Sequence, residues 1–315
     1  MLDKGREKSI SIKICFLIIV LFVVFVPVWA PQMWLHLVIE IFILALLATS
    51  LNMVLGRSGL LSIGHACFYA VGGYTFAILA AKFKVPFFLA MLAVPTTVVI
   101  FAVIIGYFSI RLTGIHFAIL TMGFAQIIWA IAHKWYRFTG GDDGMTRIPI
   151  PAILQDLVTS YYFILGVLIL SLIIIRLIQD SSFGQIIIAI RENRDRVTFS
   201  GVNVWHYLLV NFILAALFAG IAGFLLVLFT RSVFPGMGYW TTSASVILMC
   251  ILGGVGVFWG PMLGAVILTF AEHYLSMHIF YWQLVLGCLI IALVVFMPGG
   301  IGGFIKEKIE HKTHK

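Results

Sequence analysis

The chain contains a stretch of 40 residues, from Ser232 to Ala271, without a single formal charge. As one helix, rising 1.5 Å per residue, this stretch would extend about 60 Å, roughly twice the hydrocarbon thickness of a bilayer. It must therefore break into two spans. Glycine accepts unusual backbone angles and proline begins helices, so these residues indicate where the break lies. The sequence predicts it at Gly253, Gly254, Gly256, Gly260 and Pro261.

The composition of the whole chain agrees with membrane insertion. Hydrophobic residues make up 62% of the 315 residues and charged residues only 10%, whereas soluble globules have about 45–50% apolar and about 25% charged residues. Since a span needs roughly 20 residues, about ten spans account for the apolar share and leave little room for a soluble catalytic domain. The net charge of +8 is then explained by cytoplasmic loops rather than by nucleic-acid binding.

Charge-free runs between charges, glycines and prolines predict an all-α polytopic transmembrane helical bundle of about ten spans. The expected spans cover residues 14–30, 34–55, 64–81, 86–109, 113–133, 160–177, 208–229, 241–256, 261–277 and 280–297. The first of them follows Lys4, Arg6, Lys8 and Lys13 and imitates a secretory signal. Because its apolar run is longer than a signal core and further spans follow, it is interpreted as a retained anchor.

The distribution of basic residues indicates the orientation. With the N-terminus inside, ten spans place both termini in the cytoplasm, and fourteen of the twenty lysines and arginines then lie on that side. This excess favours the assigned orientation over its inverse. Residues 1–315 are expected to form one transmembrane domain, with a cytoplasmic loop at 180–206 and an external loop at 134–160.

The cytoplasmic loop has the pattern of a docking element. Apolar residues 186–190 are expected to lie against the bundle, and residues 191–196 to form a mixed-charge helical patch that ends at Gly201. Such a patch would suit a partner protein. The alternative is a solvated loop that merely follows the positive-inside rule.

Five phrases, in order along most of the chain, carry a family resemblance. Residues 183–193 read FGQIIIAIREN, followed by Gly201, Val202 and Asn203. The other phrases are LNMVLGRSGLLSIGH at 51–65 with GGY at 72–74, TGGDDG at 139–144, LGGVG at 252–256 with WGP at 259–261, and PGGIG at 298–302. Together they resemble the permease subunits of bacterial branched-chain amino acid ABC transporters. The chain departs from that family at residues 194–200, where small residues are common.

The resemblance implies an importer subunit in the bacterial inner membrane. The implied partners are two cytoplasmic ABC ATPases, a second related permease, and a periplasmic or lipid-anchored binding protein. ATP and Mg would be bound by the ATPases, and this chain would hold no cofactor. The implied residues of the coupling loop, which transmits ATP-driven closure, are Gly184, Arg191, Glu192, Asn193 and Gly201. The implied substrates are leucine, isoleucine and valine, although related systems carry urea, short amides or aromatic acids.

The source of energy separates the remaining function classes. The chain has no phosphate-binding GxxxxGK[ST] motif and no Gly-Lys dipeptide, so it is not itself the ATPase. An autonomous channel or a gradient-coupled carrier is the alternative, and it would transport without partners. An intramembrane enzyme is disfavoured because neither HExxH nor GxSxG occurs.

Polar residues within apolar segments are candidates for the transport pathway. Glu40 lies inside a predicted span, where a carboxylate is costly unless it has a function or a structural hydrogen bond. His65 belongs to a family-like phrase and could shape a helix break or be a satisfied structural histidine. The same phrase contributes Asn52 and Ser62, and Gly256 marks a possible broken helix beside the pathway. No metal site is expected, because neither the four cysteines nor the adjacent Asp142 and Asp143 have ligand spacing.

Overall fold

The computed structural model describes residues 24–27, 29–297 and 299–303. Its helices from the second predicted span onward are α2 (Gln32–Asn52), the π-helix η1 (Met53–Arg57), α3 (Ala66–Ala81), α4 (Phe87–Ser109), α5 (Gly114–Lys134), α6 (Tyr136–Thr139), α7 (Leu157–Asp180), α8 (Ser182–Glu192), α9 (Arg194–Phe199), α10 (Val204–Thr230), α11 (Trp240–Gly253), α12 (Gly260–His278) and α13 (Trp282–Phe296). Every predicted span from residue 34 onward coincides with one of them. Most of the anchor at 14–30 lies outside the described residues, which include only 24–27, 29 and 30 of it.

The all-α character is confirmed. By length and composition, five of the described helices can cross a membrane: α2 with η1, α4, α5, α7 and α10. The apolar helices α3, α11 and α13 are shorter. The full number of spans and their orientation stay predictions.

Helices α2 and α10 form the centre of the bundle. The most apolar part of α2 is 83% buried and that of α10 is 67% buried, whereas the values for α4, α5 and α7 are 28%, 28% and 33%. The peripheral helices expose large apolar side chains such as Leu92 and Ile104 of α4. In a membrane protein this pattern is that of lipid-facing helices around a protein-packed core.

Glycines allow α3 and α10 to pack closely. A Cβ atom at Gly223 of α10 would lie 1.8 Å from the carbonyl oxygen of Tyr69, and one at Gly72 of α3 would lie 2.1 Å from that of Gly220. Side chains at these positions would force the two backbones apart. The small residues therefore explain how α3 lies directly against α10.

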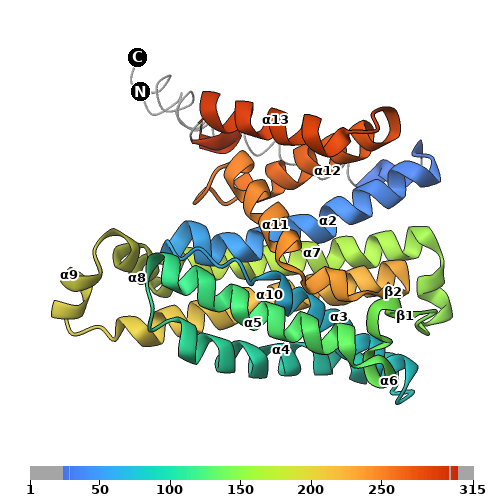
Figure 1. Cartoon of the computed structure of the whole chain (residues 1–315), viewed down its shortest axis with the longest axis horizontal. Helices are drawn as coiled ribbons and strands as arrows, with labels where there is room; N and C mark the ends of the chain where they lie inside the picture. Colours follow the sequence, from blue (N-terminus) through green and yellow to red (C-terminus); the bar gives the residue numbers. More distant parts are fainter. Residues whose placement is uncertain (1–23, 28, 298, 304–315) are drawn as a thin grey trace, which may run out of the picture.

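The two ends of the bundle differ in structure (Figure 1). Helices α8 and α9 lie at one end, and α6 lies at the other together with strands β1 (Met145–Thr146) and β2 (Ser232–Val233). The strands pair antiparallel, with Met145 opposite Val233 and Thr146 opposite Ser232. The predicted external loop at 134–160 also contains the 3-10 helices η2 (Gly141–Asp143) and η3 (Ala152–Gln155), and η4 (Pro235–Gly238) follows β2.

The predicted break in the uncharged stretch is confirmed. Helix α11 ends at Gly253 and α12 begins at Gly260. Between them, Gly254 and Gly256 have φ angles of +109° and +84°, which side chains disfavour. Helices α12 and α13 lie as a further layer on α11 and α2 (Figure 1).

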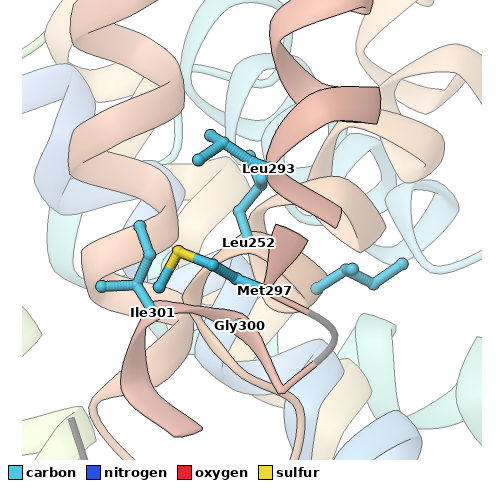
Figure 2. A pocket seen from close by; sticks show the side chains of 6 residues that line it. Leu252, Leu293, Met297, Gly300 and Ile301 are labelled. Carbon is cyan, nitrogen blue, oxygen red and sulfur yellow. The ribbon is translucent and has the colours of Figure 1, made fainter. Parts of the chain in front are cut away.

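A small pocket lies where α11 meets α13 and the segment that follows it. Figure 2 shows its lining by Leu252, Leu293, Met297 and Ile301, all apolar, beside Gly300. With no polar group to orient a ligand, this pocket is a packing feature of the α11–α13 layer.

Candidate functional site

Helix α8 is amphipathic and lies along the end of the bundle. Its buried residues Gly184, Ile187 and Ile190 recur every three positions and face inward. A Cβ atom at Gly184 would lie 2.2 Å from the carbonyl oxygen of Gln179, so only glycine permits this sharp turn from α7 into α8. Phe183 stacks on Tyr207 of α10, with ring centroids 5.6 Å apart.

The helical patch expected at 191–196 is divided between two helices, because the chain leaves the helical conformation at Asn193. This residue has an extended backbone, and its side-chain oxygen accepts the N–H of Arg196 at 2.9 Å, which caps α9. Asn203 caps α10 in the same way through the N–H of His206. Asparagine favours such N-cap positions over helix interiors, and Gly201, with φ at +82°, turns the chain between the two helices.

The outward surface of this end carries both charged and apolar groups. Glu192 is exposed and, within the described chain, makes no side-chain hydrogen bond or ion pair. Phe199, the last residue of α9, is 90% exposed. We call the exposed residues Ser182, Gln185, Glu192 and Phe199 the outer surface of α8 and α9.

Arg191 behaves differently from its neighbour Glu192. Its guanidinium donates a hydrogen bond to the backbone carbonyl of Gly56 in the π-helix η1. One turn earlier, the Asn52 amide donates to the carbonyl of Val257 at 3.1 Å and accepts the N–H of Gly256 at 3.1 Å. Asn52, Gly56, Arg191 and Gly256 thus meet, and we call them the junction.

Glycine is required where the junction is tightest. A Cβ atom at Gly56 would lie 2.1 Å from the Asn52 side-chain oxygen and 2.6 Å from the Gly256 nitrogen. At Gly256, a Cβ atom would lie 3.4 Å from both the Arg191 guanidinium and the Gly56 carbonyl oxygen. The backbone approach of η1 to the α11–α12 break therefore depends on the lack of side chains there.

Further basic residues surround the junction. Arg57 donates to the Gln179 side chain at 3.0 Å, and Arg176 pairs with Asp180 at 2.6 Å. The Arg176 guanidinium also lies 5.2 Å from the centre of the Phe258 ring in the α11–α12 break. The end of α7 thus contacts both η1, through Gln179, and the α11–α12 break, through Arg176.

A second group of polar residues is buried inside the bundle. The Nε2 atom of His65 lies 2.9 Å from the Ser50 hydroxyl, and the N–H of Ala66 donates to Ser243 at 2.9 Å. Within the described residues, the Ser62 hydroxyl and His65 Nδ1 have no hydrogen-bond partner. The end of the non-helical segment before α3, at Ser62 and His65, is therefore buried in the protein, although Gly59 and Leu61 earlier in the segment are exposed.

Glu40 stands apart from both groups. It is exposed on α2 and lies within electrostatic range of His273 and Glu272 on α12 and of Tyr69 on α3. The structure thus brings Asn52 and Gly256 together with Arg191, places Ser62 and His65 in a separate buried region, and leaves Glu40 on an open face.

Sequence reasoning did not single out several residues that complete these arrangements: Ser50, Arg176, Gln179 and Ser243. Each acts through a partner distant in sequence, as when Ser243 accepts the N–H of Ala66 from 177 positions away. A lone serine or glutamine in an apolar helix carries no local signal of its partner.

The family model for the permease component of branched-chain amino acid transport systems matches residues 33–294. The chain is 27% identical to the high-affinity branched-chain amino acid transport system permease protein LivM of Escherichia coli (strain K12), over 85% of this chain and 69% of that protein. It is 24% identical to permease protein LivH of the same system and organism, over 82% of this chain and 91% of that protein. No solved structure matches the chain. Because the family match covers most of its length, the chain belongs to the branched-chain amino acid transport permease family, whose members are multi-pass membrane proteins without a catalytic domain.

Proposed function

We propose that this chain is a membrane-spanning subunit of an ATP-driven importer of branched-chain amino acids in the bacterial inner membrane. The observation that carries the proposal is the family match across residues 33–294. The proposal includes ten spans with both termini in the cytoplasm, which agrees with the positive-inside distribution of lysine and arginine. ATP and Mg belong to partner subunits.

The outer surface of α8 and α9 is the proposed docking site for a cytoplasmic ATPase. The buried face of α8, formed by Gly184, Ile187 and Ile190, holds this helix against the bundle. A force applied to α8 is therefore transmitted to the spans. Phe199 offers an exposed aromatic anchor next to the charged residues of α8 and α9. Exposed aromatic groups rimmed by charges are typical of protein interfaces.

A second permease subunit is the proposed partner within the membrane. The similarity of this chain to two permease proteins of one Escherichia coli system supports such a pair. An exposed carboxylate such as Glu40 cannot face hydrocarbon without a large cost, so the α2–α12 face is expected to lie against protein or a polar path. Glu40 with His273 would then line the pathway that the two permeases form, and the buried Ser62 and His65 would lie deeper beside it.

The external end suits a substrate-binding protein. The segments around β1 and β2 form an ordered rim that such a protein could contact. Leucine, isoleucine and valine are the proposed substrates.

The test is purification of the tagged chain from its native membranes in mild detergent, followed by mass spectrometry of the copurifying proteins. Recovery of P-loop ATPases and a second permease is expected. A chain that is reproducibly recovered alone would overturn the proposal in favour of an autonomous channel or carrier.

The substrate is tested with the recovered complex in proteoliposomes, with its binding protein and ATP. Uptake of radiolabelled leucine is expected, with competition by isoleucine and valine and none by urea. Uptake of urea or an aromatic acid in preference to leucine would refute the substrate while leaving the importer class intact.

A further inference from the structure

Asn52 joins two distant parts of the chain through one side chain. It is 1% exposed, and its amide makes both hydrogen bonds to the break between α11 and α12, at Gly256 and Val257. A shift of the end of α2 must therefore carry the break with it or lose both bonds. Because Asn52 is buried, it is not available for contact with another subunit.

Arg191 joins the same end of α2 to α8. Carbonyl groups in the last turn of a helix lack intrahelical partners, and a cation there also interacts favourably with the helix dipole. The bond from Arg191 to the Gly56 carbonyl meets both conditions. Gly59 fixes the path of the arginine, since a Cβ atom at this glycine would lie 3.1 Å from the Arg191 side chain.

The element between these two contacts is a π-helix. Short π-helical segments are frequent at functional sites. Asn52 and Gly56 lie one helical turn apart, so a displacement of Gly56 is passed to Asn52 over a short, rigid distance. Asn211 of α10 holds the start of the same π-helix through the Met53 carbonyl at 2.8 Å but makes no bond to the break.

We infer that Asn52 and Arg191 are positioning residues that transmit movement of α8 through η1 to the α11–α12 break. This inference rests on the proposed function, in which an ATPase moves α8. The order of contacts is Arg191 to Gly56, then Asn52 to Gly256 and Val257. The break, with its two glycines at positive φ, is the part that changes conformation when the pathway opens or closes.

The experiment measures leucine transported per ATP hydrolysed by the purified native complex in proteoliposomes. Asn52→Leu removes both hydrogen bonds at similar side-chain size, and Asn211→Leu is the matched control on the same π-helix. For Asn52→Leu the complex is expected to keep its ATPase and to hydrolyse ATP. The transport ratio should fall about tenfold or more, equivalent to about 1.4 kcal/mol of coupling. Asn211→Leu should lower thermal stability and keep the wild-type ratio.

Arg191→Ala should reduce the ratio as Asn52→Leu does, and Arg191→Lys should restore part of it, since lysine can still donate to the Gly56 carbonyl. A wild-type ratio in Asn52→Leu, or an Arg191→Ala complex that has lost its ATPase, would overturn the inference. If Asn52→Leu does not assemble, Asn52→Asp is measured instead, because aspartate keeps the acceptor for Gly256 and loses the donor to Val257. A reduced transport ratio is again expected, and a wild-type ratio would overturn the inference. Absence of an ATPase from the wild-type complex would instead refute the proposed function.

Discussion

The guanidinium of Arg191 donates a hydrogen bond to the carbonyl of Gly56, a residue 135 positions earlier in the chain. Its neighbour Glu192 is exposed. Both residues are exposed, but of the two only Arg191 makes a side-chain hydrogen bond within the described chain. One can hold the spans while the other is free for a partner, so the two can be separated by mutation.

Gly56→Ala should destabilise the junction. The added methyl group would overlap the Asn52 side-chain oxygen and the Gly256 nitrogen, and overpacking of this kind costs about 1–3 kcal/mol. The thermal unfolding midpoint of the detergent-solubilised chain should fall.

The control for this substitution is Gly166→Ala in α7, where a Cβ atom meets nothing within 4 Å. It should leave the midpoint unchanged or raise it, since glycine is less favourable than alanine in a helix by roughly 0.5–1 kcal/mol. Equal midpoints for the two variants would show that the junction tolerates a side chain at residue 56.

Phe199→Ala should weaken recovery of the ATPase with the tagged chain. Interface anchors of this type contribute about 2 kcal/mol or more, enough to lower ATPase retention clearly in a titrated pull-down. Phe234→Ala is the control, because Phe234 is also exposed but lies beside β2 at the opposite end of the bundle. Undiminished recovery with Phe199→Ala would remove α9 from the docking surface.

Glu40→Gln should alter leucine uptake more than Glu272→Gln. Both side chains are exposed, but Glu40 lies farther from the end of its helix and within electrostatic range of His273. A carboxylate in that position is expected to have a function, since its burial in a membrane is costly. Initial uptake rates at equal membrane content decide the matter, and wild-type rates in both variants would make Glu40 a structural residue.

Ser50→Ala should lower stability by removing the partner of the buried His65. An orphaned buried polar group costs about 1–3 kcal/mol, and His65 Nε2 makes its hydrogen bond to the Ser50 hydroxyl. Ser276→Ala on the exposed part of α12 is the control, where the lost bond to the His273 carbonyl can be replaced by solvent. Thermal midpoints measured in the same detergent compare the two, and equal values would contradict a stabilising role for the Ser50–His65 contact.

Local patterns in the sequence predicted the helices well. Apolar runs long enough to satisfy their own backbone hydrogen bonds have few alternatives in a bilayer, so the helices after residue 34 follow directly from the pattern. The break at Gly253–Gly260 was predictable for the same reason, since length forbids one helix and glycine allows the turn. The interruption at Asn193 was missed because the charged run favoured a continuous helix, whereas its asparagine preferred to cap the next one.

The sequence by itself thus determined the membrane class, the positions of the helices and, through five phrases, the family. Only the tertiary structure decided which polar residues meet. Asn52 and Gly256 are separated by 204 positions, and nothing near either residue specifies the other. Hydrogen bonds between such residues depend on how whole helices pack, and packing is a property of surfaces assembled from the entire chain. The same physics left Glu40 exposed on a largely buried helix, a fact that its position in an apolar segment did not reveal.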